Sequence, residues 1–264
     1  MKTISSLVPF ALAATMLLWV PTAAAQSGTQ ALDQAIVELD GEVTPEARAV
    51  VERMTTFLQD LQRFEVSARI TRDETLPFGY KLQNNETTRM TVRRPDRMRV
   101  DVDGDIKHRS YYYDGATLTM VAPDEQVCAR TQAPATIAEV VDDLLDAGAE
   151  LPLIDVLRQS FTGDLLQGVR FGLRVGESKV DGVSTDHLAF RQPSVDWQIW
   201  VAKDGQPKKI LITTRFEVGD PQYQAILDWK LNPKHDARTF SFKPSKDTLE
   251  IPFHVDGIAA ETAQ

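Results

Sequence analysis

Apolar residues occupy every second position along much of the segment 88–131. They include Met98, Val100 and Val102 in one run and Leu118 and Met120 in another. A period of two residues indicates strands with one buried side and one solvent-facing side. Asp103-Gly104 and Asp114-Gly115 lie between such runs and supply the conformations that tight hairpins need. The segment is therefore predicted to form an antiparallel meander that the other segments cover or extend.

The same period continues on both sides of this meander. It predicts about eleven strands, near residues 65–74, 80–93, 97–103, 107–113, 116–122, 126–131, 169–179, 184–191, 196–203, 207–218 and 222–231. The segment 240–253 carries spaced aromatic residues and Pro244, and we expect it to pack on an edge of the sheet. The predicted fold class is mainly β (α+β), with one antiparallel sheet.

A period of 3.6 residues predicts helices before and within the set of strands. Thr44 suits the N-cap of a helix over residues 44–61, and Pro45 suits its first position. A helical insert at 134–147, followed by a short helix at 151–160, begins with a threonine and a glutamate at the spacing of a capping box. Its apolar stripe consists of Ile137, Val140, Val141, Leu144 and Leu145. We expect this stripe to face the sheet, with Gly148 and Pro152 letting the insert swing as a lid.

Residues 1–25 have the features of a cleaved signal peptide. Lys2 is followed by an apolar run at 8–20 and by small residues at 23–25. Pro21 and the shortness of the run disfavour the alternative, a membrane anchor. Gln26, and not a cysteine, follows the predicted cut, so we expect a soluble periplasmic protein without a lipid anchor. We further expect a flexible lead-in at 26–43, one folded domain at 44–254 and a disordered tail at 255–264.

Charge and residue types argue against several functions. The chain has 29 basic and 38 acidic residues and a net charge of −9, which disfavours nucleic acid and anionic lipid as partners. Its 4 histidines are far apart, and nucleotide-binding and nucleophile motifs are missing. We interpret Asp142, Asp143 and Asp146 as solvated surface rather than as a metal site. We therefore expect no catalysis, no metal and no cofactor, and we expect Cys128 to be a buried small side chain.

Three short motifs resemble those of the LolA/LolB/RseB-like periplasmic lipoprotein-carrier superfamily. They are Arg-Pro-Asp-Arg-Met-Arg at 94–99, the segment 113–125 around Asp114-Gly115, and the segment 197–210 that starts at Trp197. The order of the elements is similar too: a signal peptide, a helix, a meander, a helical insert and a second meander. More narrowly, the chain resembles a family of predicted periplasmic proteins within this group. The resemblance covers about residues 45–245.

This resemblance implies a strongly curved half-barrel sheet whose concave face is lined by apolar side chains and closed by helices. In the carriers that cavity takes lipoprotein acyl chains, so the expected ligand is a lipid, an acyl chain or another apolar molecule. The alternative is an RseB-like sensor or protein-interaction module of the cell envelope. An arginine on the carriers' second strand corresponds by motif to Arg94. Arg94 could close the site by donating to helix or loop carbonyls, or belong to an exposed row with Arg93, Arg97 and Arg99.

The candidate ligand-binding residues are those expected on the concave face and its lid. They are Arg94, Met98, Val100, Tyr111, Tyr113, Leu118, Met120, Val140, Leu144, Trp197, Ile199 and Phe216. For each aromatic residue among them, ordinary core packing is the alternative interpretation. Trp197 and Trp200 are an odd number of positions apart, so they should point to opposite faces of their strand.

Overall fold

The computed structural model describes residues 42–147, 153–163 and 165–253. The chain divides into two compact units, Met1–Glu38 and Leu39–Gln264, and every described residue belongs to the second. The predicted signal peptide at 1–25 and the predicted tail at 255–264 lie outside the described residues. So does nearly all of the predicted lead-in at 26–43.

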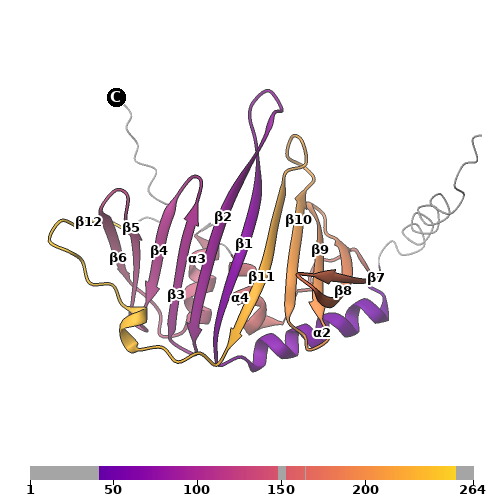
Figure 1. The fold of residues 1–264 in the computed structure, drawn as a ribbon, viewed down its shortest axis with the longest axis horizontal. Coiled ribbons are helices and arrows are strands. Elements are labelled where there is room, and N and C mark those ends of the chain that lie inside the picture. The colour runs from indigo at the N-terminus through magenta and orange to yellow at the C-terminus, as the bar shows by residue number, and fades with distance from the viewer. Residues whose placement is uncertain (1–41, 148–152, 164, 254–264) are drawn as a thin grey trace, which may run out of the picture. The chain divides into compact units, whose positions relative to one another are not determined.

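A 12-stranded sheet in the order β12-β6-β5-β4-β3-β2-β1-β11-β10-β9-β8-β7 forms the framework (Figure 1). All neighbouring strands in it are antiparallel except β12, which pairs parallel with β6. The bounds are β1 (Arg63–Thr75), β2 (Lys81–Arg93), β3 (Arg97–Gly104), β4 (His108–Tyr113), β5 (Thr117–Ala122), β6 (Val127–Gln132), β7 (Phe171–Val180), β8 (Val183–Arg191), β9 (Val195–Ala202), β10 (Pro207–Thr214), β11 (Gln222–Leu231) and β12 (Leu249–Ile251).

All the predicted strands are present, and the mainly β fold class with one curved antiparallel sheet is confirmed. The extra strand, β12, comes from the segment that was expected to pack on an edge. The largest difference is in β10, which ends at Thr214 and not near residue 218. The neighbouring strand β9 begins at Val195, opposite Thr214, so β10 has no β9 partner beyond this point. The Arg215 guanidinium then donates to the carbonyls of Gln192 and Pro193 in the β8–β9 turn.

Three helices follow the predicted positions closely. In α2 (Pro45–Asp60) the Thr44 hydroxyl caps the first turn by accepting the N–H of Ala47 at 3.3 Å. In α3 (Ile137–Asp146) the capping box between Thr136 and Glu139 is formed in both directions. The second short helix is α4 (Ile154–Thr162). The predicted hinge residues 148 and 152 lie outside the described residues.

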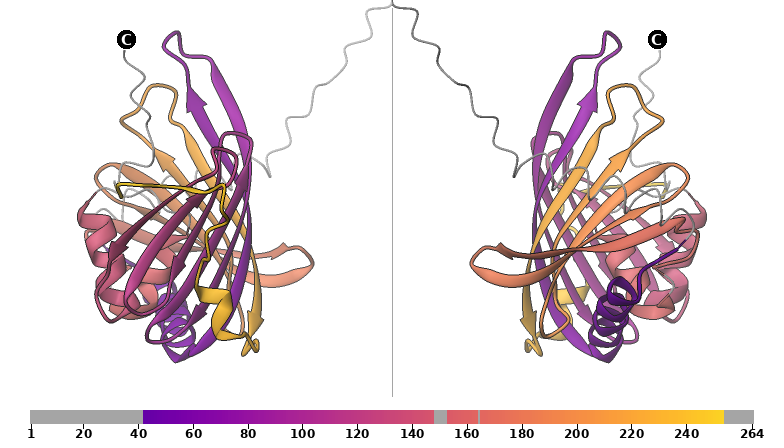
Figure 2. Two further views of the ribbon diagram at one scale, coloured as in Figure 1. Left: turned by 90° about the vertical axis from the view of Figure 1, so that its left-hand side faces the viewer. Right: turned by 90° about the vertical axis from the view of Figure 1, so that its right-hand side faces the viewer.

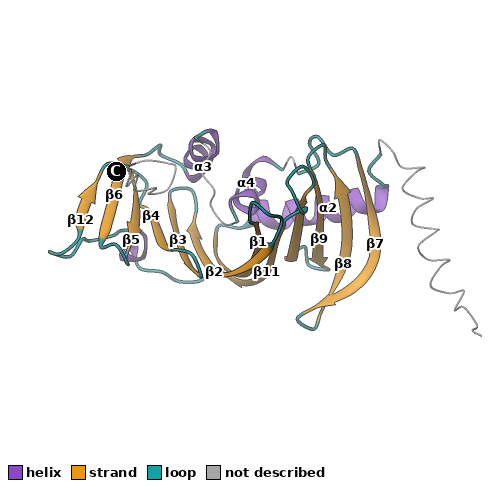
Figure 3. Ribbon diagram, turned by 90° about the horizontal axis from the view of Figure 1, so that it is seen from above, coloured by secondary structure: helices purple, strands orange, loops and turns teal. Residues whose placement is uncertain are grey.

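The sheet curls around these helices, so they occupy its concave side (Figure 3). Residues directly opposite each other in antiparallel strands project to the same face. The register therefore produces apolar rows across β2 to β5. One row consists of Val92, Met98, Tyr113 and Leu118, and the next of Met90, Val100, Tyr111 and Met120. These rows form a continuous apolar surface on the concave face, which we call the concave lining.

The chain after β11 crosses the other, convex face (Figure 2). It contains the short 3₁₀ helix η1 (Ala237–Phe240), whose Phe240 is fully buried. The Arg93 guanidinium lies 5.5 Å from the centroid of the Phe240 ring, and the ring centroids of Tyr112 and Phe242 are 5.6 Å apart. The protein thus covers both faces of β2 to β4 with side chains from outside the sheet.

Cys128 is buried on β6, as predicted from its place in a strand-like run. Burial raises the pKa of its thiol, so little thiolate is available at neutral pH. We expect Ellman's reagent to leave the folded protein unmodified and to label one thiol per chain after denaturation. Rapid labelling of the native protein would contradict this placement.

Candidate functional site

The structure brings most of the candidate residues into one buried apolar cluster. Its members among them are Met98, Val100, Tyr113, Leu118, Val140, Leu144, Trp197 and Ile199. Tyr111 is half-buried and packs against this cluster, and Met120 is buried beside Tyr111 in the same row. Residues from both meanders and from the helical insert thus share one buried cluster.

Phe216 is the exception among the candidates. The prediction that it lies in a strand is wrong, because β10 ends before it and its side chain is 75% exposed in the β10–β11 loop. The alternating pattern of β10 runs on through Phe216 and Val218, so it did not show that the strand ends at Thr214. Phe216 stays outside the concave lining.

Helices cover the concave lining with their own apolar faces. Val50, Met54 and Leu58 of α2, Val140 and Leu144 of α3, and Leu157 of α4 belong to the same buried cluster. The first turn of α3 is joined to the sheet by the Ile137 N–H, which donates to the Pro95 carbonyl at 2.8 Å. The buried positions of the concave lining are therefore covered by helix side chains.

The hydroxyl of Tyr113, a residue of the concave lining, holds the segment just before α3. The hydroxyl donates to the carbonyl of Pro134, just before α3. Burial, with the nearby Asp96 carboxylate, raises the pKa of Tyr113 to about 12. Tyr113 therefore remains a protonated donor at any physiological pH, and the bond does not respond to pH.

Arg94 lies in the β2–β3 turn and connects two helices. Its guanidinium donates to the carbonyls of Leu58 (3.2 Å) and Gln59 (3.0 Å) in the last turn of α2. It also donates to the carbonyl of Ser160 (2.9 Å) in the last turn of α4, and it lies over the ring of Phe161 at 4.7 Å. We call this arrangement the Arg94 junction.

The Arg94 junction supplies what both helix ends lack. The last carbonyls of a helix have no partner within the helix, and the negative end of its dipole favours a cation there. Neither α2 nor α4 has a basic residue in its last turn. Partial burial lowers the pKa of the Arg94 guanidinium, which nevertheless stays charged, as arginine does in proteins. Each charge-assisted bond contributes up to about 1.5–3 kcal/mol.

The neighbouring arginines have other partners. Arg97 donates to the carboxylate of Asp96 at 2.6 Å, and Arg99 donates to that of Asp101 at 2.9 Å. Arg93 lies against Phe240 on the convex face. Among the contacts that these arginines make with described residues, only those of Arg94 reach helix carbonyls, so the alternative that Arg94 is one of an exposed row with these residues is wrong.

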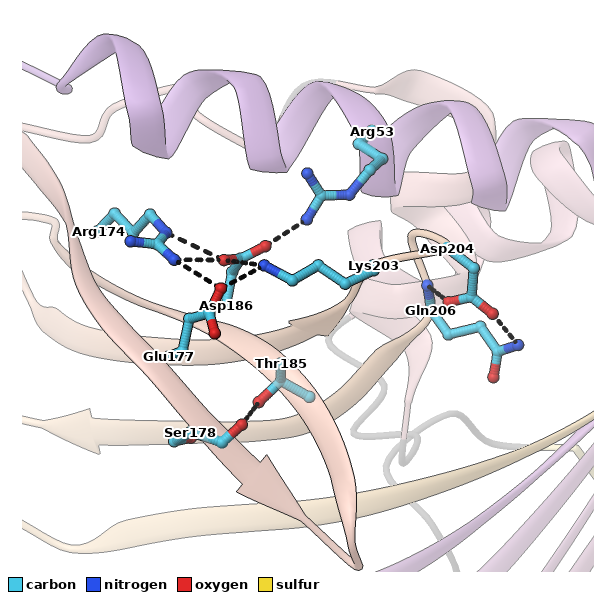
Figure 4. A network of polar contacts seen from close by, with 9 residues as sticks. All are labelled: Arg53, Arg174, Glu177, Ser178, Thr185, Asp186, Lys203, Asp204 and Gln206. Carbon is cyan, nitrogen blue, oxygen red and sulfur yellow. Dashed lines mark hydrogen bonds and ion pairs between the residues drawn. The ribbon is translucent and has the colours of Figure 1, made fainter.

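A second polar cluster, which we call the Asp186 network, fixes α2 to the other half of the sheet (Figure 4). The buried Asp186 carboxylate of β8 accepts from Arg53 of α2 at 2.7 Å, from Arg174 of β7 at 2.7 Å and from Lys203 at 3.1 Å. Lys203 also donates to Glu177 at 2.7 Å. The N-terminus of α2 is also held to β7, because the Thr44 N–H donates to the Gly172 carbonyl at 2.9 Å.

The Asp186 network was not predicted, although the sequence contains a signal for it. Asp186 alternates along β8 with Leu188 and Phe190, so its side chain is on the same face as theirs. Leu188 and Phe190 both lie in the buried cluster. An aspartate at such a position must find partners when it is buried. Its partner Arg53 is 133 positions away in the chain, so the sequence did not identify it.

The Asp186 network gives the protein a specific dependence on acid. Burial alone would raise the pKa of Asp186, but hydrogen bonds from Arg174, Lys203 and Arg53 outweigh this effect and hold the pKa below its ordinary value. A lowered folded-state pKa stabilises the protein above the unfolded-state pKa, about 4, and this stabilisation is lost as pH falls through the folded value.

We expect Asp186→Asn to lower stability by about 1 kcal/mol at neutral pH and to make melting temperature less sensitive to pH below about 4. Thermal melts of both proteins across this acid range provide the measurement. Parallel pH profiles for the two proteins would show that Asp186 does not carry the effect.

Trp197 and Trp200 point to opposite faces, as predicted. Trp197 stacks on Phe190 within the concave cluster, with ring centroids 4.1 Å apart. Trp200 stacks on His187 at 4.2 Å, and the Lys209 ammonium lies 4.6 Å from its ring centroid. Trp200 is thus held on the convex side, outside the concave cluster.

The fold and this site define a class of protein: an open, curled antiparallel sheet whose apolar concave face is covered by helices. This is the architecture that the resemblance to LolA/LolB/RseB-like proteins implied. The chain belongs to the family described as "Predicted periplasmic protein (DUF2092)", whose model matches residues 47–254. No curated protein matches the chain.

Several solved structures are similar to this chain. MucB matches with 15% identity and a TM-score of 0.43, over 77% of this chain and 65% of the MucB chain, which is less than two thirds of that protein. The Mycobacterium tuberculosis lipoprotein LppX matches with 13% identity and a TM-score of 0.40, over 71% of this chain and 98% of its own. A putative outer membrane lipoprotein-sorting protein domain from Vibrio parahaemolyticus matches with 7% identity and a TM-score of 0.34, over 72% and 94%. Values this low carry no information about function.

Two observations concern the described part of the chain only. No helix in it is both long and apolar enough to cross a membrane. No group of three or more His, Cys, Asp or Glu side chains in it could hold a metal ion.

Proposed function

We propose that this protein is a non-catalytic binding or carrier protein that holds a lipid, a lipoprotein acyl chain or another apolar ligand against the concave lining. The Arg94 junction is the observation that supports this function most. A single guanidinium there joins the ends of two helices that cover an apolar surface. Movement of one side chain can therefore separate the end of α4 from α2.

The site can exchange its helix contacts for contacts with an alkyl chain. Loss of the three bonds at Arg94 costs at most about 5–9 kcal/mol, and each buried methylene contributes about 0.8 kcal/mol. Roughly six to eleven methylenes offset this loss. The proposed ligand is therefore a long alkyl chain rather than a small apolar molecule.

The part that moves consists of α3 and α4 in this proposal. Arg53 of the Asp186 network and the backbone bond between Thr44 and Gly172 both hold α2 to the sheet. The ring of Phe57 adds an edge contact with Trp229, with centroids 5.6 Å apart. By contrast, α4 is joined to α2 through Arg94.

The proposal includes the location of the protein. The family is described as periplasmic, and the features of residues 1–25 fit a cleaved signal. We propose that the mature protein is soluble and carries no lipid anchor, since Gln26 follows the proposed cut.

The direct test is to export the protein, purify it without detergent and extract it with organic solvent. Mass spectrometry of the extract should show an alkyl-chain lipid, and the extracted protein should take up a fluorescent fatty acid. A specifically bound polypeptide, with no lipid and no fatty-acid uptake, would instead favour the sensor or interaction module.

A further inference from the structure

Five large apolar side chains are exposed on two neighbouring loops at one end of the sheet. Phe78, Tyr80 and Leu82 of the β1–β2 hairpin are 79%, 60% and 39% exposed. Phe216 and Val218 of the β10–β11 loop are 75% and 73% exposed. We call these five residues the apolar tips. Monomeric proteins seldom gather large apolar side chains in one exposed place without an interaction that uses them.

The two loops are held beside each other. The Gln222 N–H, at the start of β11, donates to the Asp73 carboxylate of β1 at 3.2 Å. A Cβ built on Gly219 would lie 3.5 Å from side-chain atoms of Lys81 and Thr75. Both loops project at the same end of the sheet, beyond the helices (Figures 1 and 2). The apolar tips therefore form one edge made by two separate loops.

The apolar tips contribute nothing to the core. The buried positions of β1 end at Ile70, and the buried positions of β2 begin at Thr88. Beyond Arg72, the last β1 residue paired with β11, and before Glu86, the first β2 residue paired with β3, the hairpin is a two-stranded ribbon. The Leu76 carbonyl accepts the Gly79 N–H at 2.8 Å to close its turn. Stability of the fold therefore does not explain why the ribbon ends in Phe78 and Tyr80.

The tip of the β1–β2 hairpin has the polarity of a segment at a membrane–water interface. Residues 75–80 (Thr-Leu-Pro-Phe-Gly-Tyr) contain no group that is charged at neutral pH. Charged residues lie beside and between the tips, namely the bases Lys81 and Arg215 and the acids Asp73, Glu74, Glu217 and Asp220. Aromatic residues favour the headgroup level of a bilayer, where an apolar ring meets a wet layer. A lipid bilayer can also deform around both loops at once, whereas a protein partner would need a matching pocket for each loop.

We propose that the apolar tips dock the protein on a lipid surface, with Phe78 and Phe216 entering the boundary between headgroups and acyl chains. The excess of acids around the tips and the net charge of −9 give no attraction to anionic lipid. Docking therefore depends on apolar burial and is insensitive to salt. It is separate from the concave lining, so it does not require a bound ligand.

Vesicle flotation tests this docking. The purified protein is mixed with vesicles of phosphatidylcholine, and separately with vesicles of phosphatidylethanolamine and phosphatidylglycerol, at low and high salt. We expect the protein to float with both kinds at both salt levels. Phe78→Ser combined with Phe216→Ser should lower the partition constant about tenfold or more, since two large rings are lost. Leu249→Ser is the matched control, because Leu249 is 64% exposed on β12 and lies outside the apolar tips.

A reporter variant gives a second readout. Phe78→Trp should show a blue-shifted emission with vesicles, and Leu249→Trp should not. Docking by the apolar tips is contradicted if the wild-type protein stays unbound, if the double variant floats as well as wild type, or if binding requires anionic lipid and disappears in salt. Fatty-acid uptake by the double variant in solution separates this proposal from the proposed function, because uptake should be unchanged.

Discussion

Replacing Leu144 by aspartate is expected to lower the free energy of unfolding by about 2 kcal/mol or more and to speed ligand exchange. Leu144 lies in α3 and is only 7% exposed within the apolar cluster. A carboxylate there must either stay buried without a partner or pull α3 away from the lining. Thermal melts and the release rate of a fluorescent fatty acid measure the two consequences.

Leu144→Met is the matched control, since it keeps the volume and the apolar character and should cost less than about 1.5 kcal/mol. The exposed residue Asp143 offers a second control on the same helix, through Asp143→Asn. If Leu144→Asp melts and takes up fatty acid as the wild-type protein does, α3 is not the lid.

Replacing Arg94 by leucine is expected to slow the release of an apolar ligand. Each 1.4 kcal/mol by which the variant destabilises the closed state should slow release about tenfold. The junction stabilises only the closed arrangement, in which the carbonyls of α2 and α4 meet one guanidinium. Without it the loaded, open state becomes relatively more stable. Release of a pre-bound fluorescent fatty acid, followed after dilution, gives the rate.

Two variants show whether the effect is specific to the Arg94 junction. Arg97→Leu removes a neighbouring guanidinium that bonds only to Asp96 among the contacts described, and it should release ligand at the wild-type rate. Arg94→Lys keeps the charge without the planar fork and should fall between wild type and Arg94→Leu. Equal behaviour of Arg94→Leu and Arg97→Leu in release and in melting would remove any special role for Arg94.

Much of the fold was predictable because its elements depend on local sequence. The alternation through Met98, Val100 and Val102 identifies a strand and its buried side, and Thr44 with Pro45 locates the start of α2 within a residue. The same reasoning placed most candidate residues on one surface, because strand parity is a geometric consequence of the backbone. The same alternation predicted too long a β10, because Phe216 continues the strand pattern beyond Thr214, where the strand ends.

The polar contacts were less predictable because they join distant parts of the chain. Arg94 was identified only through a motif, and its partner Ser160 is 66 positions away. Arg53 and Asp186 looked like ordinary charged residues until the curl of the sheet brought them together. Such pairs depend on how the sheet bends around α2, and no period in the sequence records this bend.

Quenching of tryptophan fluorescence by a brominated fatty acid tests the central claim that the concave lining receives an acyl chain. Trp197 and Trp200 are three positions apart on β9, but only Trp197 belongs to the concave cluster. Proteins that retain one of them are made with phenylalanine at the other and at Trp229. Trp19 lies in the proposed signal peptide and would be absent from the mature protein.

Bromine quenches an indole only on contact, so the two proteins report opposite faces of one strand. We predict strong, saturable quenching of the protein that retains Trp197, and none of the protein that retains Trp200. Equal quenching of both proteins, or quenching of Trp200 alone, would contradict binding on the concave face.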